Sequence, residues 1–384
     1  MMKRLLLLLL AASVLTGCAA DKDMSRSEIT ADNSEKPQYI RQEQDHYDNG
    51  CIYAVLRGNK FIPYYLDFET METSIVCSKP NCTHNSSDCL ANQLTAAPVF
   101  HGGYIYFFTR NEYVEELRSG KCEFRMDSSL KRASLETSEV ETVCEFHDAS
   151  PNIGQGYILY GSKLYFHAYD PEPVSDEYGY ISWGSSGGTD YICSIDLDTA
   201  EYRNYGSLCG NPDPGRQRSS VYLAGCYKNK FYLGYAYLSN SDVTDPGVAE
   251  FELSCYVFDP GTETITKSNM PYPHYCDEDT YLYVDEDNNK AYLTYKDREY
   301  IFDELLMDAR VSDDGKLFYS GGWYDLDTMI KHIYSSGNTG ESSGYKYVAH
   351  YDGSYIFSTR NECAQTVFVK LTEKELLASA HTEE

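Results

Sequence analysis

The sequence has few basic residues, and this shortage limits the partners that the protein can have. It contains 32 lysines and arginines against 59 aspartates and glutamates, which gives a formal net charge of −27 over 384 residues. Proteins that bind nucleic acid present a basic surface that neutralises phosphates. We therefore expect no nucleic-acid partner.

Long apolar runs are also scarce. One begins at Leu5 and continues to Leu15, directly behind Lys3 and Arg4. This run is shorter than the roughly 18 to 20 apolar residues that a membrane-spanning helix needs. A basic flank, a short apolar run and a small-residue end predict a secretory signal, and we expect no membrane-spanning helix in the mature chain.

The end of the signal resembles the lipobox of bacterial lipoproteins. It reads Leu15-Thr16-Gly17-Cys18. The resemblance implies that residues 1–17 are a signal peptide and that Cys18 becomes the new N-terminus. Its thiol would carry a lipid with acyl chains such as palmitate, which would anchor the protein to the outer face of the cell membrane. The alternative is an ordinary signal peptide with a chance cysteine.

Residues 18–44 follow as a polar segment with neither helical nor strand periodicity. Such a composition cannot bury enough apolar surface to fold alone, which predicts a disordered tether. A flexible segment of about 25 residues spans on the order of 25 to 30 Å. It would lift a folded domain off the membrane.

The rest of the chain lacks a sustained helical period, which argues against an α/β fold. Instead, a hairpin repeats, with a Gly, Asn or Asp turn followed by a strand that contains Tyr or Phe. The repeats centre on residues 51–55, 104–107, 163–166, 230–233, 290–293, 316–319 and 354–357. These turn residues tolerate the positive φ angles that tight hairpins require.

A second hairpin, with an acidic residue before a Thr or Gly turn, follows most of the first ones. Examples lie at residues 66–72, 135–141, 195–201, 258–264 and 324–328. Two hairpins make a four-stranded sheet, and roughly 340 residues over seven units gives about 48 per unit, near the 40 to 50 of a propeller blade. We predict an all-β fold, a single β-propeller over residues 45–378, with a tail at 379–384.

Seven blades are predicted, and six are the alternative. Only 26 residues separate Tyr292 from Phe318, which leaves the fifth unit short. A β-sandwich normally has about 100 residues, so the chain would need three of them, and no linker divides it.

At this point the chain resembles a group of extracytoplasmic propeller lipoproteins of anaerobic Gram-positive bacteria, most of them without an assigned function. The resemblance covers the lipobox and the two hairpin types from about residue 45 to the end. It implies architecture and location in the cell envelope, and it does not imply an activity.

Twelve cysteines remain beside Cys18. Eight of them are scattered singly, many on predicted strands, where buried free thiols are the ordinary interpretation. They are Cys51, Cys122, Cys144, Cys193, Cys209, Cys226, Cys255 and Cys276. The anaerobic source that the resemblance implies favours reduced thiols over six bridges.

Three other cysteines differ from these, because they stand close together and near a histidine. Cys77, Cys82, His84 and Cys89 lie within 13 residues. Three thiolates and an imidazole can close a tetrahedral zinc shell, although the spacing is not that of a standard finger. The alternatives are a disulfide from Cys77 or Cys82 to Cys89, which we prefer, or free thiols. A similar Cys-x4-Cys-x-His segment in the lipoprotein group implies a stabilising role, and no other cofactor is expected.

Two segments match the start of a catalytic or calcium-binding motif, but each lacks a feature that the motif requires. Residues 184–188 match G-x-S-x-G, but a strand-like segment follows where a nucleophile elbow needs a helix. Residues 285–289 begin like a calcium loop, but Lys290 and Lys296 stand where Gly and Glu are required. Catalytic residues therefore stay unassigned, and we expect that the protein is not an enzyme.

Two functions remain. The first is a membrane-tethered binding or scaffold module for a glycan or an envelope protein. The second is a carbohydrate-active enzyme, a glycoside hydrolase or lyase, that uses carboxylates in the propeller channel. For the first, the candidate site is the insertion at 169–190, with Tyr178, Tyr180 and Trp183, whose rings offer flat contact area. Trp183 packing the insertion onto its blade is the equal alternative.

Overall fold

The computed structural model describes most of the chain beyond residue 44 and two short segments before it. The described residues are 22–23, 37–40, 45–47, 49–57, 60–77, 79, 82–84, 86–87, 89–94, 98–116, 122–146, 150–151, 156–170, 173–175, 181–183, 189–208, 218–238, 251–306, 308–334, 345–360 and 366–383.

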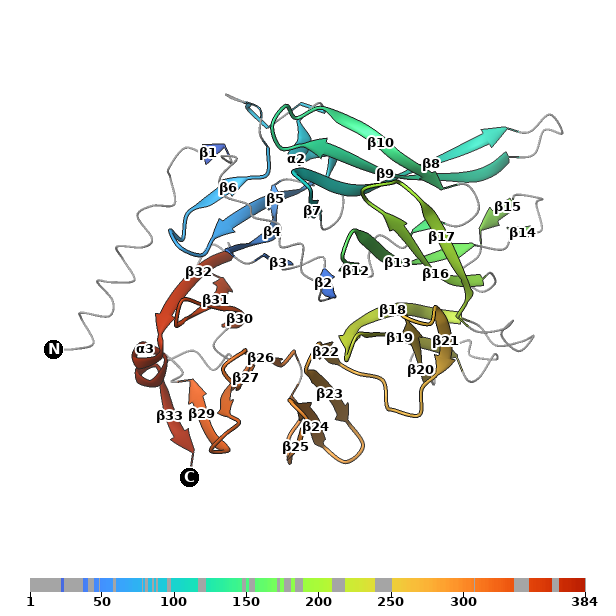
Figure 1. The fold of residues 1–384 in the computed structure, drawn as a ribbon. Helices are drawn as coiled ribbons and strands as arrows, with labels where there is room; N and C mark the ends of the chain where they lie inside the picture. Colours follow the sequence, from blue (N-terminus) through green and yellow to red (C-terminus); the bar gives the residue numbers. More distant parts are fainter. Residues whose placement is uncertain are drawn as a thin grey trace.

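The protein is an all-β propeller, as predicted, with its sheets arranged around a common centre (Figure 1). Helices in the described chain are short, namely α2 (Leu90–Gln93) and α3 (Glu373–Ala378). Within the same residues, no helix is long and apolar enough to cross a membrane.

Three sheets come from the first half of the chain. The first has the order β1-β6-β5-β4-β3 and contains β1 (Lys22–Asp23), β3 (Asp45–Tyr47), β4 (Gly50–Arg57), β5 (Lys60–Asp67) and β6 (Thr73–Ile75). The second contains β7 (Val99–His101), β8 (Tyr104–Glu116), β9 (Cys122–Ser134), β10 (Val140–Phe146), β14 (Pro173–Ser175) and β15 (Ile181–Trp183). The third contains β2 (Gln38–Ile40), β11 (Ser150–Pro151), β12 (Tyr157–Tyr160), β13 (Lys163–Asp170), β16 (Thr189–Asp196) and β17 (Tyr202–Ser207).

The second half forms the rest of the ring. An eight-stranded sheet contains β18 (Arg218–Tyr227), β19 (Lys230–Leu238), β20 (Phe251–Asp259), β21 (Thr264–Lys267), β22 (Tyr275–Asp277), β23 (Thr280–Asp285), β24 (Lys290–Tyr295) and β25 (Arg298–Phe302). The next contains β26 (Arg310–Val311), β27 (Lys316–Tyr319), β28 (Gly322–Asp325), β29 (Ile330–Tyr334) and β33 (Ala380–Glu383). The last contains β30 (Lys346–Tyr351), β31 (Ser354–Arg360) and β32 (Thr366–Thr372).

The eight-stranded sheet consists of two antiparallel groups, β18–β21 and β22–β25. A parallel bridge between Gly225 and Cys276 joins them. Gly225 has φ 146°, and an added Cβ would lie 2.3 Å from the Cys276 carbonyl oxygen, so the close approach requires glycine. The blade number of seven, with six as its alternative, stays a prediction.

The predicted hairpins lie where the repeat places them, with one shift of register. In the fifth unit the turn at Asn288–Asn289 joins β23 and β24, the middle pair of β22–β25, instead of the opening pair. The opening turn lies at Glu278–Asp279, between β22 and β23. The short spacing noted from the sequence follows from this shift, because the fifth unit has four strands. Residues 285–289 form a hairpin turn, in which Asp285 accepts hydrogen bonds from Asn288.

Segments expected outside the propeller also join its sheets. In the predicted tether, β1 pairs with β6 and β2 pairs with β12. In the predicted tail, β33 pairs with β29 along four residue pairs. Backbone hydrogen bonding at open sheet edges explains these additions, because it does not depend on an apolar pattern.

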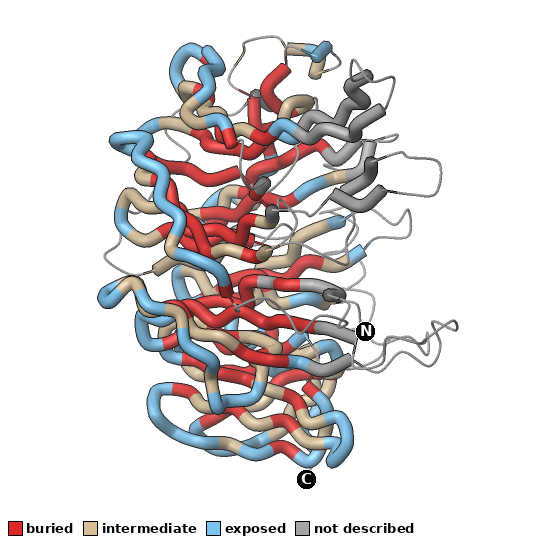
Figure 2. The backbone as a smooth tube through the Cα atoms, turned by 90° about the vertical axis from the view of Figure 1, so that its right-hand side faces the viewer, coloured by how far each residue is buried: buried red, intermediate tan, exposed pale blue. Residues whose placement is uncertain are grey.

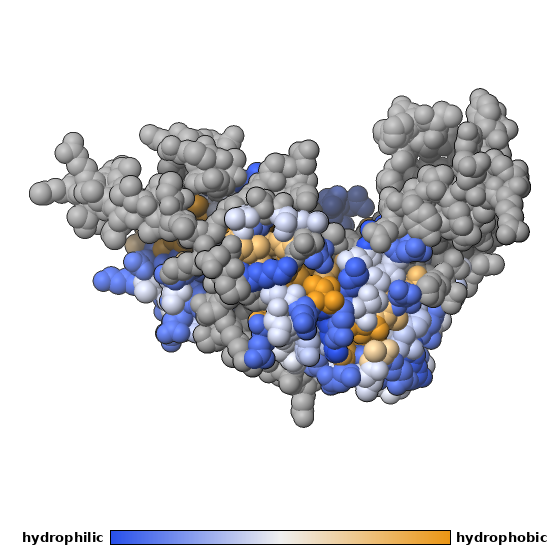
Figure 3. Space-filling model, turned by 90° about the horizontal axis from the view of Figure 1, so that it is seen from above, coloured by the Kyte–Doolittle hydropathy of each residue, from blue (hydrophilic) through white to orange (hydrophobic). Residues whose placement is uncertain are grey.

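The core lies between neighbouring sheets, where their faces meet. The cluster between the second and third sheets includes Phe108, Phe146 and Phe166, whose rings lie 5.2 to 5.9 Å apart. Figure 2 shows buried residues along the middle of the strands and exposed residues at the turns. On the face in Figure 3, apolar residues form small patches among hydrophilic ones.

Candidate metal centre

The four residues of the Cys/His cluster lie between the end of β6 and the start of α2. Cys77 is two residues beyond β6, and its N–H donates to the Ile75 carbonyl at 2.7 Å. Cys89 is the N-cap of α2 and has extended backbone angles. Both thiols are fully buried, whereas Cys82 and His84 are half-buried. Two ordered elements therefore hold the two ends of the loop.

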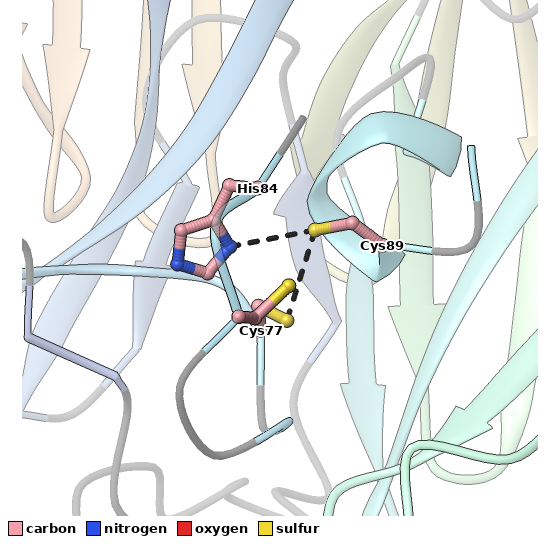
Figure 4. A group of neighbouring side chains, drawn as sticks. Cys77, His84 and Cys89 are labelled. Carbon is pink, nitrogen blue, oxygen red and sulfur yellow. Dashed lines mark hydrogen bonds between the residues drawn. The ribbon is translucent and has the colours of Figure 1, made fainter. Parts of the chain in front are cut away.

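The donor atoms converge on one point. The Sγ atoms of Cys77 and Cys89 are 3.8 Å apart, and Nδ1 of His84 lies 3.4 Å from the Cys89 Sγ. Figure 4 shows these three side chains pointing toward one another. One donor atom from each of Cys77, Cys82, His84 and Cys89 lies within 4.8 Å of the others.

These separations match the edges of a zinc tetrahedron. With Zn–S near 2.3 Å and Zn–N near 2.05 Å, tetrahedral geometry places two sulfurs about 3.8 Å apart and sulfur and nitrogen about 3.6 Å apart. The observed 3.8 and 3.4 Å agree with both values. The cluster thus has the donor types and the spacing of a closed, four-coordinate site.

The disulfide that we preferred from the sequence is not formed. Cys77, Cys82 and Cys89 are free cysteines. A disulfide joins its sulfurs at about 2.05 Å, and the Cys77–Cys89 separation of 3.8 Å is a contact between thiols. The sequence contains the same residues for both outcomes, and only the folded geometry distinguishes them.

Burial affects the charge of the thiols. Desolvation raises the pKa of Cys77, and desolvation with the nearby Cys77 raises the pKa of Cys89 to about 12. Both thiols are protonated near neutral pH without an ion. A metal would have to displace their protons, so its binding would weaken as the pH falls.

Local hydrogen bonds shape the loop around the donors. His84 has a positive φ of 52°, and the side-chain amide of Asn92 donates to the carbonyls of His84 and Ser86 at 2.9 and 2.8 Å. Asn92 lies on α2. The helix therefore fixes both the Cys89 thiol and the backbone that carries the imidazole.

The other candidate residues are described only in part. Cys18, Tyr178 and Tyr180 lie outside the described residues, as does the G-x-S-x-G string at 184–188. Trp183 lies on β15 and pairs with Pro173 on β14, but its side chain is outside the described part. Among the scattered cysteines in the described chain, Cys51, Cys193, Cys226, Cys255 and Cys276 are buried and outside any disulfide, as expected, and Cys144 is half-buried and also outside any disulfide.

A second group of polar residues was not found from the sequence. His350 on β30 lies 2.6 Å from Asp313, and the Asp314 carboxylate is near both. The Asp314 carboxylate already accepts three hydrogen bonds. Lys316 donates to it at 2.7 Å, and Ser312 and Tyr355 donate as well. This saturation argues against a metal there. No sequence signal joins positions 37 residues apart.

A buried histidine–carboxylate pair was also missed. Nε2 of His167 on β13 lies 2.6 Å from Asp190 on β16, and both side chains are almost fully buried. Nδ1 of His167 has no hydrogen-bond partner within the described structure. A single His in a strand gives no sequence signal for such a pair.

Comparisons with known proteins leave the family open. No family model and no curated protein matches the chain. Among solved structures, an oligogalacturonate lyase from Vibrio parahaemolyticus is 11% identical, with a TM-score of 0.36 over 89% of this chain and 93% of that one. TolB from Acinetobacter baumannii is 11% identical, with a TM-score of 0.29 over 93% of this chain and 67% of that one. With scores below 0.5, neither similarity carries a functional argument.

Proposed function

We propose that this chain is an extracytoplasmic lipoprotein whose propeller works as a binding or scaffold module for a glycan or an envelope protein. The anchor is supported by the basic flank, the apolar run and the lipobox ending at Cys18. Cys18→Ala should release the protein into the medium or leave unprocessed precursor, whereas Cys144→Ala should not. Unchanged membrane fractionation of Cys18→Ala would contradict the anchor.

The observation that carries the binding function is the position of the insertion at 169–190. It leaves the third sheet after β13 and forms β14 and β15, and β15 then pairs with β9 through Ile181 and Glu123. Figure 1 shows both strands beside the long β8–β9 hairpin, to one side of the ring. Segments inserted into a rigid scaffold commonly contain the residues that bind a ligand or partner.

The chemistry of this insertion fits a glycan or a protein surface. It contains Tyr178, Tyr180 and Trp183. Aromatic side chains provide large contact areas at low entropic cost. We expect these residues to supply the main contacts.

A glycan and peptide array tests this function. Trp183→Ala should weaken binding by about tenfold or more, as expected for an aromatic hot spot. Ile301→Ala is the matched control, because Ile301 is 60% exposed on β25 in a different sheet. Equal binding by the wild type and Trp183→Ala would remove this site.

One observation supports the enzyme as a second candidate. Desolvation raises the pKa of Asp277 on β22, whereas hydrogen bonds outweigh desolvation and lower the pKa of Asp314. The negative charges of both carboxylates contribute to the raised pKa of Tyr347, on β30. Carboxylates with opposite shifts are typical of acid–base pairs. Glycan turnover that is lost in Asp277→Asn would favour this candidate.

For the Cys/His cluster we propose structural zinc. Soft thiolate donors and a closed four-coordinate shell favour zinc and leave no position for a substrate. Purified protein should contain about one zinc ion per chain, and Cys82→Ser should lose it while Cys144→Ser keeps it. Metal-free wild type with a Cys77–Cys89 disulfide would contradict this proposal.

A further inference from the structure

The first and last sheets of the ring meet without sharing a strand. In the described chain, β30–β32 form their own three-stranded sheet, and none of these strands pairs with β3–β6. Figure 1 shows the two sheets side by side. We call this junction the seam. Because backbone pairing does not close it, the contacts of side chains must.

One hydrogen bond and two ring contacts between described residues cross the seam. Nζ of Lys370 on β32 donates to the Phe68 carbonyl at 2.8 Å. The ring of Phe68 lies 5.8 Å from that of Tyr351. Tyr53 and Phe368 make an edge contact at 4.7 Å. The ring contacts show that apolar packing joins the two sheets in the described part of the seam.

The thiols of the candidate metal centre belong to this apolar seam. Cys77, Cys89 and Ala91 form one buried cluster with residues of the first sheet and with three residues of the last sheet. These three are Val348, Ala349 and Ile356. Cys82 packs against the same cluster. The donors thus lie within the core that holds the two ends of the ring together.

Their immediate neighbours face a different core. Val76, Leu90 and Leu94 belong to the cluster between the first and second sheets. That cluster also contains Phe100, Ile105 and Phe107 from β7 and β8. Residues adjacent in sequence, such as Val76 and Cys77, therefore enter opposite cores. Described residues of segment 76–94 therefore contribute to the packing on both faces of the first sheet.

Among its described residues, segment 76–94 contains little regular secondary structure. Its helix has four residues, and inside the loop the Cys82 and Cys89 amides donate to Lys79 and Ser86 at 3.3 and 3.2 Å. An ion bound by donors from both ends of the loop would fix Cys77 relative to Cys89. The free energy of metal binding would then stabilise the folded arrangement.

We propose that a metal ion bound at this centre helps to hold the propeller ring closed, and we call this role the clasp. The bound ion keeps segment 76–94 in place, and residues of this segment pack in the seam and in the core between the first and second sheets. The clasp rests on the zinc centre proposed above. It makes closure of the ring depend on the metal.

Hydrogen–deuterium exchange of the zinc-loaded full chain, before and after treatment with a zinc chelator, tests the clasp. Chelation should raise exchange rates at least tenfold in residues 73–94, in 346–357 across the seam and in 98–107. Residues 280–302, on the far side of the ring, should not change. Cys82→Ser should reproduce this pattern, and Cys144→Ser should behave as the wild type.

The outcomes separate the clasp from the zinc centre. If zinc is bound but chelation affects only residues 73–94, the clasp is wrong and the zinc centre stands. If purified protein binds no zinc, both are wrong. If chelation raises amide exchange throughout the chain, including residues 280–302, zinc is required for the whole fold. This result would also contradict the clasp. Should Cys82→Ser fail to fold, the chelated wild type provides the same comparison.

Discussion

At the scale of single residues, the polar network around Lys316 connects three elements. Its side chain on β27 is 8% exposed, and Nζ lies 2.7 Å from Asp314 and 3.3 Å from Glu373 on α3. Tyr355 on β31 donates to the same Asp314 carboxylate. Desolvation opposes the charge of Asp314, but the hydrogen bonds from Lys316 and Ser312 outweigh it and lower its pKa.

Asp314→Asn should destabilise the protein and change its response to acid. The pKa of Asp314 is lower in the folded state, so its contribution is present above about pH 4 and is lost as the pH falls through the folded-state pKa. At pH 7 the variant should lose about 1 to 3 kcal/mol, because Lys316 keeps a buried charge with fewer partners. Below pH 4 the difference from wild type should shrink. Urea unfolding at both pH values measures this.

Asp327→Asn provides the control. Asp327 pairs with Arg298, and both side chains are more than two-thirds exposed, so its loss should cost less than about 1 kcal/mol. Equal destabilisation by Asp314→Asn and Asp327→Asn, or a difference from wild type that does not change with pH, would contradict the role of the network around the buried Lys316.

The sequence identified many of the important residues, but it did not predict contacts between residues that are far apart in the chain. The spacing of Cys77 and Cys89 identified a cluster, yet the choice between disulfide and metal depends on a distance that no spacing encodes. His350 and Asp313 meet because β30 follows β27 around the ring. Neither residue has a pattern that points to the other.

At the scale of elements, the acidic hairpin turn repeats with the same internal bonds. Oδ1 of Asp67, Asp196, Asp259 and Asp325 accepts a hydrogen bond from the backbone N–H three residues later. The next residue has a positive φ in each turn, as at Met329 with φ 58°. Asp favours such turns because its carboxylate satisfies the free N–H groups. This explains why the sequence located these hairpins.

Met329→Gly should stabilise the protein. A left-handed conformation costs a residue with Cβ about 1 to 2 kcal/mol, and glycine removes that strain but loses about 0.5 to 1 kcal/mol of chain entropy. Met329 is 42% exposed, so little packing is lost. The net gain should be about 0.5 to 1 kcal/mol by urea unfolding. Ile330→Gly, at the adjacent strand position, should destabilise by about 1 kcal/mol. Destabilisation by both variants would contradict the strain at Met329.

The fifth unit shows where turn chemistry alone is insufficient. Asn288–Asn289 and Glu278–Asp279 both end a strand with polar residues, and the sequence placed the repeat on the first of these pairs. The structure places the opening turn at the second. A turn motif marks a hairpin, but the position of that hairpin within a sheet depends on which strands pack beside it.

At the scale of the whole molecule, the N-terminal segment connects the proposed anchor to the interior of the ring. β1 pairs with β6 at one edge of the first sheet, whereas β2 pairs with β12 of the third sheet. Figure 1 shows β2 near the centre of the ring. The sequence predicted a disordered tether over residues 18–44 because these residues are polar. Backbone pairing does not require an apolar pattern, so the composition of this segment did not indicate β2.

Removal of β2 should therefore weaken the ring. β12 pairs with β13 on one side and with β2 on the other, through Tyr157 with Ile40 and Leu159 with Gln38. A chain that begins at Asp45 leaves this edge of β12 unpaired, so its thermal midpoint should fall by about 2 to 5 °C, and amide exchange in residues 157–160 should accelerate. A chain that begins at Pro37 loses, of the described strands, β1 and should keep the protection of β12, because β2 remains. If both chains match the full-length protein in midpoint and in exchange at 157–160, β2 does not contribute to the ring, and the segment acts only as the tether that the sequence predicted.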